Sequence, residues 1–176
     1  SRLFWSLGLW VFAITVLMET FFALGFYSGL LIDAYLFLVA LLVVLLALGS
    51  VQLVKTRWIR IGYYVIAALG IIATAYSLAI SGFQSLMESW IVAGIPSNAI
   101  IYASSLATFP AAIVLIAIAV LGFWRTRSIK MLSIIAGVIV VSVAGTLYIA
   151  SFPSFLYYAE FVGILLLWLG FYDFKR

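Results

Sequence analysis

Residues 34–54 read AYLFLVALLVVLLALGSVQLV, an apolar run that contains no charged side chain. A helix needs about 20 apolar residues to cross the roughly 30 Å hydrocarbon core of a bilayer. This stretch is therefore long enough to span a membrane as a single helix. It indicates the fold class, because the rest of the chain repeats the same pattern.

Six stretches of this kind take up most of the chain. The predicted spans are residues 3–26, 34–54, 61–82, 99–124, 131–152 and 154–173. Asp33 is expected to cap the second helix, while Pro96 and Pro153 precede the fourth and the sixth. The first apolar stretch exceeds the 7–15 residues of a signal-peptide core, so we expect it to be a span. We predict an all-α fold, a single six-span transmembrane helical bundle over residues 1–176.

The composition excludes whole classes of protein. The chain has 176 residues, 68% hydrophobic and 8% charged, with a mean hydropathy of +1.36, whereas soluble proteins are about 45–50% apolar and about 25% charged. Soluble, disordered and nucleic-acid-binding proteins are therefore excluded. Cysteine and histidine are both absent, which excludes disulfides, thiolate metal sites, histidine-ligated haem and histidine general bases. We expect no metal site and no cofactor.

Positive charge follows the ends of the predicted spans. All nine basic residues fall on one side of the membrane: Arg2, Lys55, Arg57, Arg60, Arg125, Arg127, Lys130, Lys175 and Arg176. Lys and Arg are retained on the cytoplasmic side of short loops, so both termini are predicted to be cytoplasmic. The clusters also provide anchors for anionic lipid head groups, with the bilayer itself as the partner.

The connection between the third and fourth spans has its own pattern. Apolar residues at positions 83, 86, 87, 90 and 91 alternate with polar ones at helical spacing. This spacing predicts a short amphipathic helix over residues 83–94, lying in the outer interface. It acts either as an interfacial anchor or as a lid over an outer opening.

Two acidic residues lie within predicted spans, Glu19 in the first and Glu160 in the sixth. An acid in mid-span costs about 2.5–3.5 kcal/mol on insertion scales, so each is a functional hypothesis. From the helix rise, Glu19 lies about 7 Å and Glu160 about 5 Å outward of the middle of its span. The two carboxyls are expected at similar depth, where a close pair would share a proton or hold a cation.

Polar neighbours accompany these acids on small-residue faces. Thr15 shares a helical stripe with Glu19, and Tyr157 shares one with Glu160. Tyr35 and Tyr158 lie at comparable outer depth and can donate hydrogen bonds to the carboxyls. The candidate ligand or ion site comprises Glu19, Glu160, Thr15, Tyr157, Tyr158 and Tyr35. The alternatives are tyrosines in an interfacial aromatic belt and carboxyls that are protonated and structural.

The sequence lacks the parts of familiar membrane enzymes. Histidine is absent, and the lysines lie at the predicted cytoplasmic ends of spans, away from any membrane-embedded nucleophile. We therefore expect no enzymatic activity, no catalytic residue and no nucleic-acid partner. Two functions remain: a transporter or ion pathway for a proton or small cation, and a structural or accessory subunit with membrane-protein partners, or a homo-oligomer. The six-span plan resembles small prokaryotic transporters and substrate-capturing membrane subunits, which favours a multi-pass protein of a prokaryotic cell membrane.

Overall fold

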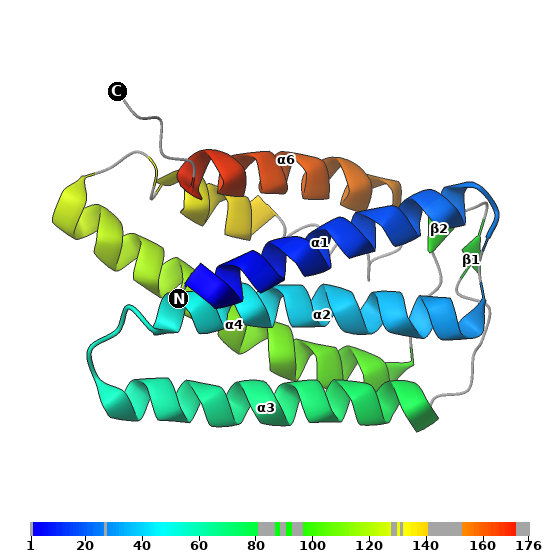
Figure 1. The fold of residues 1–176 in the computed structure, drawn as a ribbon, viewed down its shortest axis with the longest axis horizontal. Coiled ribbons are helices and arrows are strands. Elements are labelled where there is room, and N and C mark those ends of the chain that lie inside the picture. Colours follow the sequence, from blue (N-terminus) through cyan, green and yellow to red (C-terminus); the bar gives the residue numbers. More distant parts are fainter. Residues whose placement is uncertain are drawn as a thin grey trace. The chain divides into compact units, whose positions relative to one another are not determined.

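The computed structural model is almost entirely helical (Figure 1). It describes residues 2–26, 28–80, 87–88, 91–92, 97–127, 130, 132–140 and 153–171. The side chains of Tyr157 and Glu160 lie outside this description. The helices and strands are α1 (Arg2–Ala23), α2 (Gly29–Val51), α3 (Arg57–Ile80), β1 (Met87–Glu88), β2 (Ile91–Val92), α4 (Asn98–Thr126) and α6 (Pro153–Phe171).

Four of these helices, α1 to α4, are long and apolar enough to cross a membrane. They overlap the first four predicted spans, and α6 overlaps the sixth. Within the fifth predicted span, residues 132–140 are helical and residues 141–152 lie outside the described residues. The helical fold is thus confirmed, whereas the six-span topology stays a prediction.

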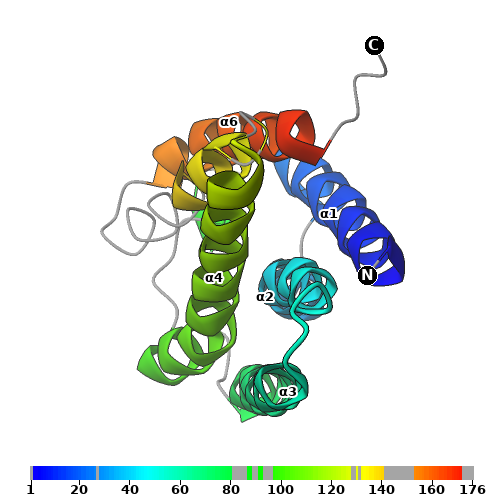
Figure 2. The same ribbon diagram turned by 90° about the vertical axis from the view of Figure 1, so that its left-hand side faces the viewer.

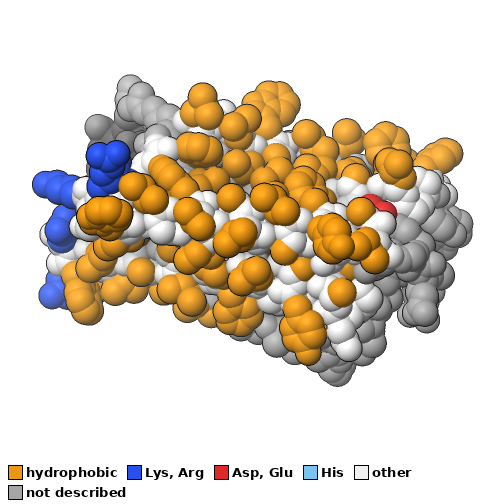
Figure 3. All heavy atoms as spheres, turned by 90° about the horizontal axis from the view of Figure 1, so that it is seen from below, with side chains coloured by type: hydrophobic (Ala, Val, Ile, Leu, Met, Phe, Trp, Pro, Cys, Tyr) orange, Lys and Arg blue, Asp and Glu red, His pale blue; other side chains and the backbone are white. Residues whose placement is uncertain are grey.

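The chain forms two compact units, Ser1–Ala111 and Ala112–Arg176. In the first unit α2 lies between α1 and α3, which the end-on view shows directly (Figure 2). Hydrophobic side chains cover α3, and Lys and Arg side chains gather at the end where it begins (Figure 3). An apolar surface bounded by basic residues is the pattern that a bilayer requires.

The α1–α2 connection uses local signals for chain reversal. Gly25 adopts a φ of 86° after the last residue of α1, and the Phe26 amide donates to the Phe21 carbonyl at 3.0 Å. Glycine tolerates this left-handed conformation because it has no Cβ. The Leu31 amide donates to the Ser28 side chain at 3.3 Å, so Ser28 is the N-cap of α2. The predicted cap at Asp33 is wrong, because the helix begins earlier and contains Asp33.

The predicted interfacial helix over residues 83–94 is wrong at the four positions described. Met87–Glu88 and Ile91–Val92 form two short antiparallel strands, with Met87 opposite Val92 and Glu88 opposite Ile91. The other positions of the predicted helix lie outside the described residues. β-Branched Ile91 and Val92 favour extended backbone, and an isolated helix shorter than about 12–15 residues is marginal in water.

Small residues bring α3 close to the first half of α4. The buried face of α3 carries Tyr63, Ala67, Gly70, Thr74 and Leu78. A Cβ on Gly70 would lie 2.7 Å from the Cα of Ala107, so the backbones approach too closely for a larger residue. Such contacts hold membrane helices together, since burial of apolar side chains gives little advantage over lipid.

The second unit uses a similar contact. A Cβ on Gly137 would lie 2.9 Å from the carbonyl oxygen of Gly163 in α6. On the same face, the hydroxyl of Ser133 donates to the carbonyl oxygen of Leu166 at 2.5 Å. Helical residues 132–140 therefore pack directly on α6.

Candidate functional site

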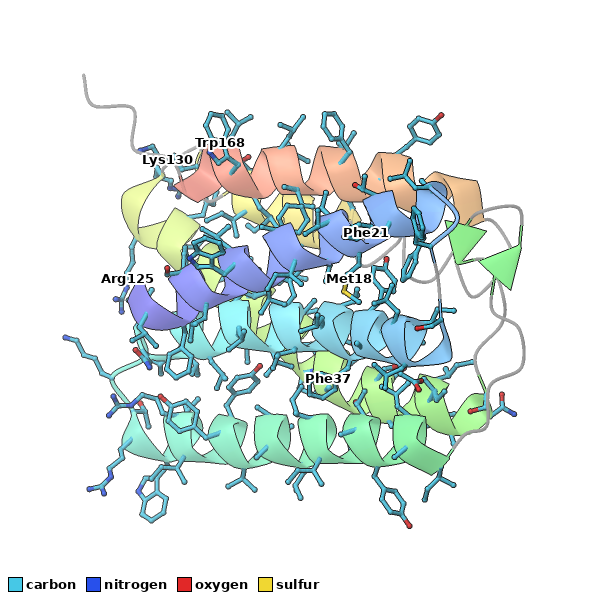
Figure 4. All side chains as sticks on the ribbon, turned by 45° about the vertical axis from the view of Figure 1, so that its right-hand side comes forward. Met18, Phe21, Phe37, Arg125, Lys130 and Trp168 are labelled. Atoms are coloured by element: carbon cyan, nitrogen blue, oxygen red, sulfur yellow. The ribbon has the colours of Figure 1, made fainter. Side chains whose placement is uncertain are left out.

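Glu19 lies beside the face of α1 that contacts α2. Thr15, Met18 and Phe22 on that face are buried, and Glu19 next to them is half-buried. Met18 points from α1 toward α2 (Figure 4). The spacing of three and four residues brings these positions to one side of the helix.

The carboxyl group of Glu19 is bonded to the neighbouring helix. The Tyr35 hydroxyl donates to Glu19 Oε1 at 2.6 Å, so the expected tyrosine donor is confirmed for this acid. Tyr35 is itself buried, and its ring meets that of Phe22 edge to face with centroids 5.5 Å apart. This contact and the burial of Tyr35 restrict the orientation of the ring, and with it the direction of the hydroxyl group.

The surroundings of this hydrogen bond are apolar. Met18, Phe22, Ile32 and Tyr35 form one buried cluster. An ionised carboxylate in such surroundings is unfavourable unless it is paired with a positive charge. The polar interactions of Glu19 are therefore its hydrogen bond with Tyr35 and any contact with a group that reaches the half-exposed side of the carboxyl group.

Positive charge in this unit lies far from Glu19. Within the described part of the chain, Glu19 forms no ion pair with a basic side chain. The turn that carries Lys55 and Arg57 follows the far end of α2, about 24 Å along the helix axis from Tyr35 at 1.5 Å per residue. Among the described residues, Tyr35 is therefore the polar side chain shown to contact the Glu19 carboxyl group.

Thr15 lies one turn from Glu19 and is only 2% exposed. Its hydroxyl donates to the Phe12 carbonyl at 2.8 Å, within its own helix. The proton of this hydroxyl is therefore used in that hydrogen bond, while the oxygen can still accept a hydrogen bond from another group. Thr15 can coordinate a cation through oxygen, but it is not a free donor.

The remaining predicted residues belong to α6 in the second unit. The side chains of Glu160 and Tyr157 lie outside the described residues, so the expected pairing of Glu160 with Glu19 stays a prediction. Tyr158 is 76% exposed. That exposure agrees better with the alternative, an aromatic residue facing the bilayer, than with a ligand-binding position.

Two features near the α1–α2 site were not anticipated from the sequence. The first is that Met18 and Phe22 surround the hydrogen bond. Their helical spacing to Glu19 in the sequence could have predicted this arrangement. An open apolar hollow of about 370 Å³, lined by Phe21, Phe26 and Leu31, lies where α1 ends and α2 begins. Its lining suits a hydrocarbon chain and supplies no oxygen ligand for an ion.

Metal binding by several protein ligands has no support in the described residues. Among them, His, Cys, Asp and Glu form no group of three able to hold a metal ion. A weakly held monovalent cation would rely on the Glu19 carboxylate and on the oxygens of Tyr35 and Thr15. Comparison with family models, curated proteins and solved structures finds no match to this chain.

Proposed function

We propose that this protein is a small membrane transporter or ion pathway in which Glu19 binds and releases a proton or a small cation. One observation carries the proposal: Tyr35 holds the Glu19 carboxyl at 2.6 Å, and no described basic side chain pairs with it. A carboxyl within a membrane span that lacks a positive partner is either protonated or occupied by a mobile cation. Both states are exchangeable, as transport requires.

In our proposal the site lies toward the outside of the membrane. In our proposal six spans cross the cell membrane of a prokaryote, with both termini and the two basic connections in the cytoplasm. Tyr35 then lies near the outer end of α2, and Glu19 beside it is reached from that side. Glu160, with Tyr157 and Tyr158 near it in sequence, supplies a second carboxyl from the sixth span.

Flux through reconstituted protein tests the proposal. Liposomes containing the full chain and an internal pH-sensitive dye are given a pH gradient, and then Na⁺ or K⁺ gradients. We expect wild-type flux above that of protein-free liposomes, and its loss in Glu19→Gln. Glutamine can still accept the Tyr35 hydrogen bond, so the α1–α2 contact is retained. Thr20→Val is the matched control, because Thr20 is exposed and its hydroxyl bonds to its own helix. Undiminished flux in Glu19→Gln would contradict the proposal.

A second candidate, a structural or accessory subunit of a larger membrane complex, is favoured by a different observation. Hydroxyl groups within the spans largely bond to their own helices. Thr15, Thr74 and Thr108 each donate to a carbonyl three or four residues earlier. Such hydroxyls contribute little to a polar pathway through the protein.

Purification under gentle conditions separates the two candidates. An accessory subunit should bring stoichiometric partner chains with it from native membranes. A transporter that acts alone should purify as a monomer or a homo-oligomer and should conduct after reconstitution. Partner chains together with absent flux would favour the second candidate.

A further inference from the structure

A basic turn joins α2 to α3 at the end of the first unit away from Glu19. Lys55 and Arg57 are exposed and Arg60 is half-buried. The acids of this unit whose side chains are described, Glu19 and Asp33, belong to α1 and to the beginning of α2. Three positive charges therefore lie close together in sequence and far from the acids described in the same unit.

The position of these charges on α3 is unfavourable without an anion. Arg57 is the first residue of the helix, Arg60 lies in its first turn, and no acid lies in that turn. The amino end of a helix carries a partial positive charge, which basic side chains there reinforce. An anion bound at this turn would neutralise both the side chains and the helix end.

Exposed apolar residues place the same turn at a membrane surface. Trp58 is 81% exposed, and Leu53 is also exposed. Tryptophan concentrates at the level of lipid head groups, because its ring is apolar and its N–H is polar. The anion available at this depth is the phosphate of a phospholipid.

Tyr63 supplies a second, independent observation. Its side chain is 5% exposed, and its hydroxyl is buried with no hydrogen-bond partner among the described residues. Tyr63 follows Arg60 by three residues, which places both on one face of α3. Long side chains in a helix lean toward its amino end, and a Tyr63 ring that follows this tendency extends toward Arg60. A buried hydroxyl without a partner is unfavourable, and a phosphate oxygen would satisfy it.

We propose that this basic turn binds the phosphate head group of an anionic phospholipid. Lys55, Arg57 and Arg60 hold the phosphate, and the Tyr63 hydroxyl donates to it from the membrane side. Trp58 fixes the depth of the turn. This site is independent of the proposed role of Glu19, because it lies at the opposite end of α2.

Titration with short-chain lipids tests this site. The full chain in neutral detergent is titrated with dioctanoyl-phosphatidylglycerol, and bound lipid is counted by native mass spectrometry. Dioctanoyl-phosphatidylcholine and inorganic phosphate are the comparison ligands. We expect phosphatidylglycerol to bind about tenfold more tightly than phosphatidylcholine, given three basic contacts. Equal binding of the two lipids would overturn the proposal, and binding of inorganic phosphate with the same affinity would overturn the assignment to a lipid.

Amino-acid substitutions distinguish a specific binding site from a general electrostatic attraction of the lipid to positive charge. Replacing Lys55, Arg57 and Arg60 together with Gln should abolish the preference for phosphatidylglycerol. Tyr63→Phe leaves the charge unchanged and should weaken binding about tenfold or more, as expected for one hydrogen bond to an anion. Unchanged binding in Tyr63→Phe would show that charge alone attracts the lipid and would overturn the built site.

The second unit provides the matched control. Arg125 and Lys130 lie at one end of that unit (Figure 4), and the Arg127 guanidinium already lies 5.8 Å from the centre of the Phe123 ring. Replacing Arg125, Arg127 and Lys130 with Gln removes the same charge and should reduce the preference for phosphatidylglycerol far less than the triple substitution at the α2–α3 turn does. An equal loss in both triple variants would contradict a site at the α2–α3 turn.

Discussion

The Tyr35 hydroxyl donates to Glu19 Oε1 at 2.6 Å and joins α2 to α1 through a polar contact beside a cluster of apolar side chains. The bond occurs at the level where both helices are buried against each other by Met18, Phe22 and Ile32. It is therefore a structural contact, and under the proposed function it also controls what Glu19 can bind.

Tyr35→Phe removes the hydroxyl and keeps the aromatic ring against Phe22. We expect a loss of about 0.6–1.7 kcal/mol in unfolding free energy, the range measured for side-chain hydrogen bonds between membrane helices. Unfolding in increasing dodecyl sulfate, followed by circular dichroism, measures the change. Tyr76→Phe is the control, because Tyr76 is 68% exposed, and it should change stability by less than about 0.5 kcal/mol. Equal effects of the two substitutions would show that the hydrogen bond contributes nothing to stability.

Gly70→Ala tests the close approach of α3 to α4. The added methyl group would lie 2.7 Å from the Cα of Ala107, so the helices must separate. We expect a loss of about 1–3 kcal/mol, typical of overpacking. Gly62→Ala in the same helix is the control, because a Cβ there meets nothing within 4 Å. It should gain up to about 1 kcal/mol from helix propensity. Thermal aggregation of the purified variants ranks them, and the opposite order would contradict the packing described.

Ser133→Ala tests the contact inside the second unit. The hydroxyl of Ser133 donates to the Leu166 carbonyl at 2.5 Å, and its removal should destabilise the protein by about 1 kcal/mol. Limited proteolysis of the variant should increase relative to wild type. Ser6→Ala, at an exposed position of α1, is the control and should leave the cleavage rate unchanged. A cleavage rate equal to that of wild type in Ser133→Ala would argue against the bond.

The absence of cysteine makes the topology simple to test. Single cysteines are introduced at Ser97 and, in a separate variant, at Ser128. An impermeant thiol reagent added to intact cells should label Ser97→Cys and leave Ser128→Cys unlabelled until the cells are opened. The reverse pattern would invert the orientation, and labelling of both positions from outside would contradict an odd number of spans between them.

The main helices and one contact of the candidate site followed from the sequence for physical reasons. The long apolar run of α2 predicts a long helix. The helix rise per residue predicted the depth of Glu19, and a tyrosine of α2 lies at a similar depth. The helix start was missed, because Asp33 and Ser28 are both good N-caps and only the backbone distinguishes them. The strands at Met87–Glu88 and Ile91–Val92 were missed because helical spacing over a short segment is weak evidence.

Other features depend on three-dimensional packing that no local pattern encodes. Tyr63 resembles the other tyrosines in sequence, and what singles it out is its burial without a hydrogen-bond partner among the described residues. Gly70 resembles Gly62, yet only Gly70 has a neighbouring backbone at contact distance. The pairing of Glu19 with Glu160 stays a prediction, since it depends on how distant parts of the chain meet.

Infrared difference spectroscopy of the reconstituted protein detects whether Glu19 exchanges a proton or a cation. Spectra are recorded while the pH, and separately the Na⁺ or K⁺ concentration, is changed over the membrane. Our account predicts a carboxyl band that responds to one of these changes, disappears in Glu19→Gln and shifts in Tyr35→Phe. A difference spectrum in which Glu19→Gln is identical to wild type under every condition would contradict it.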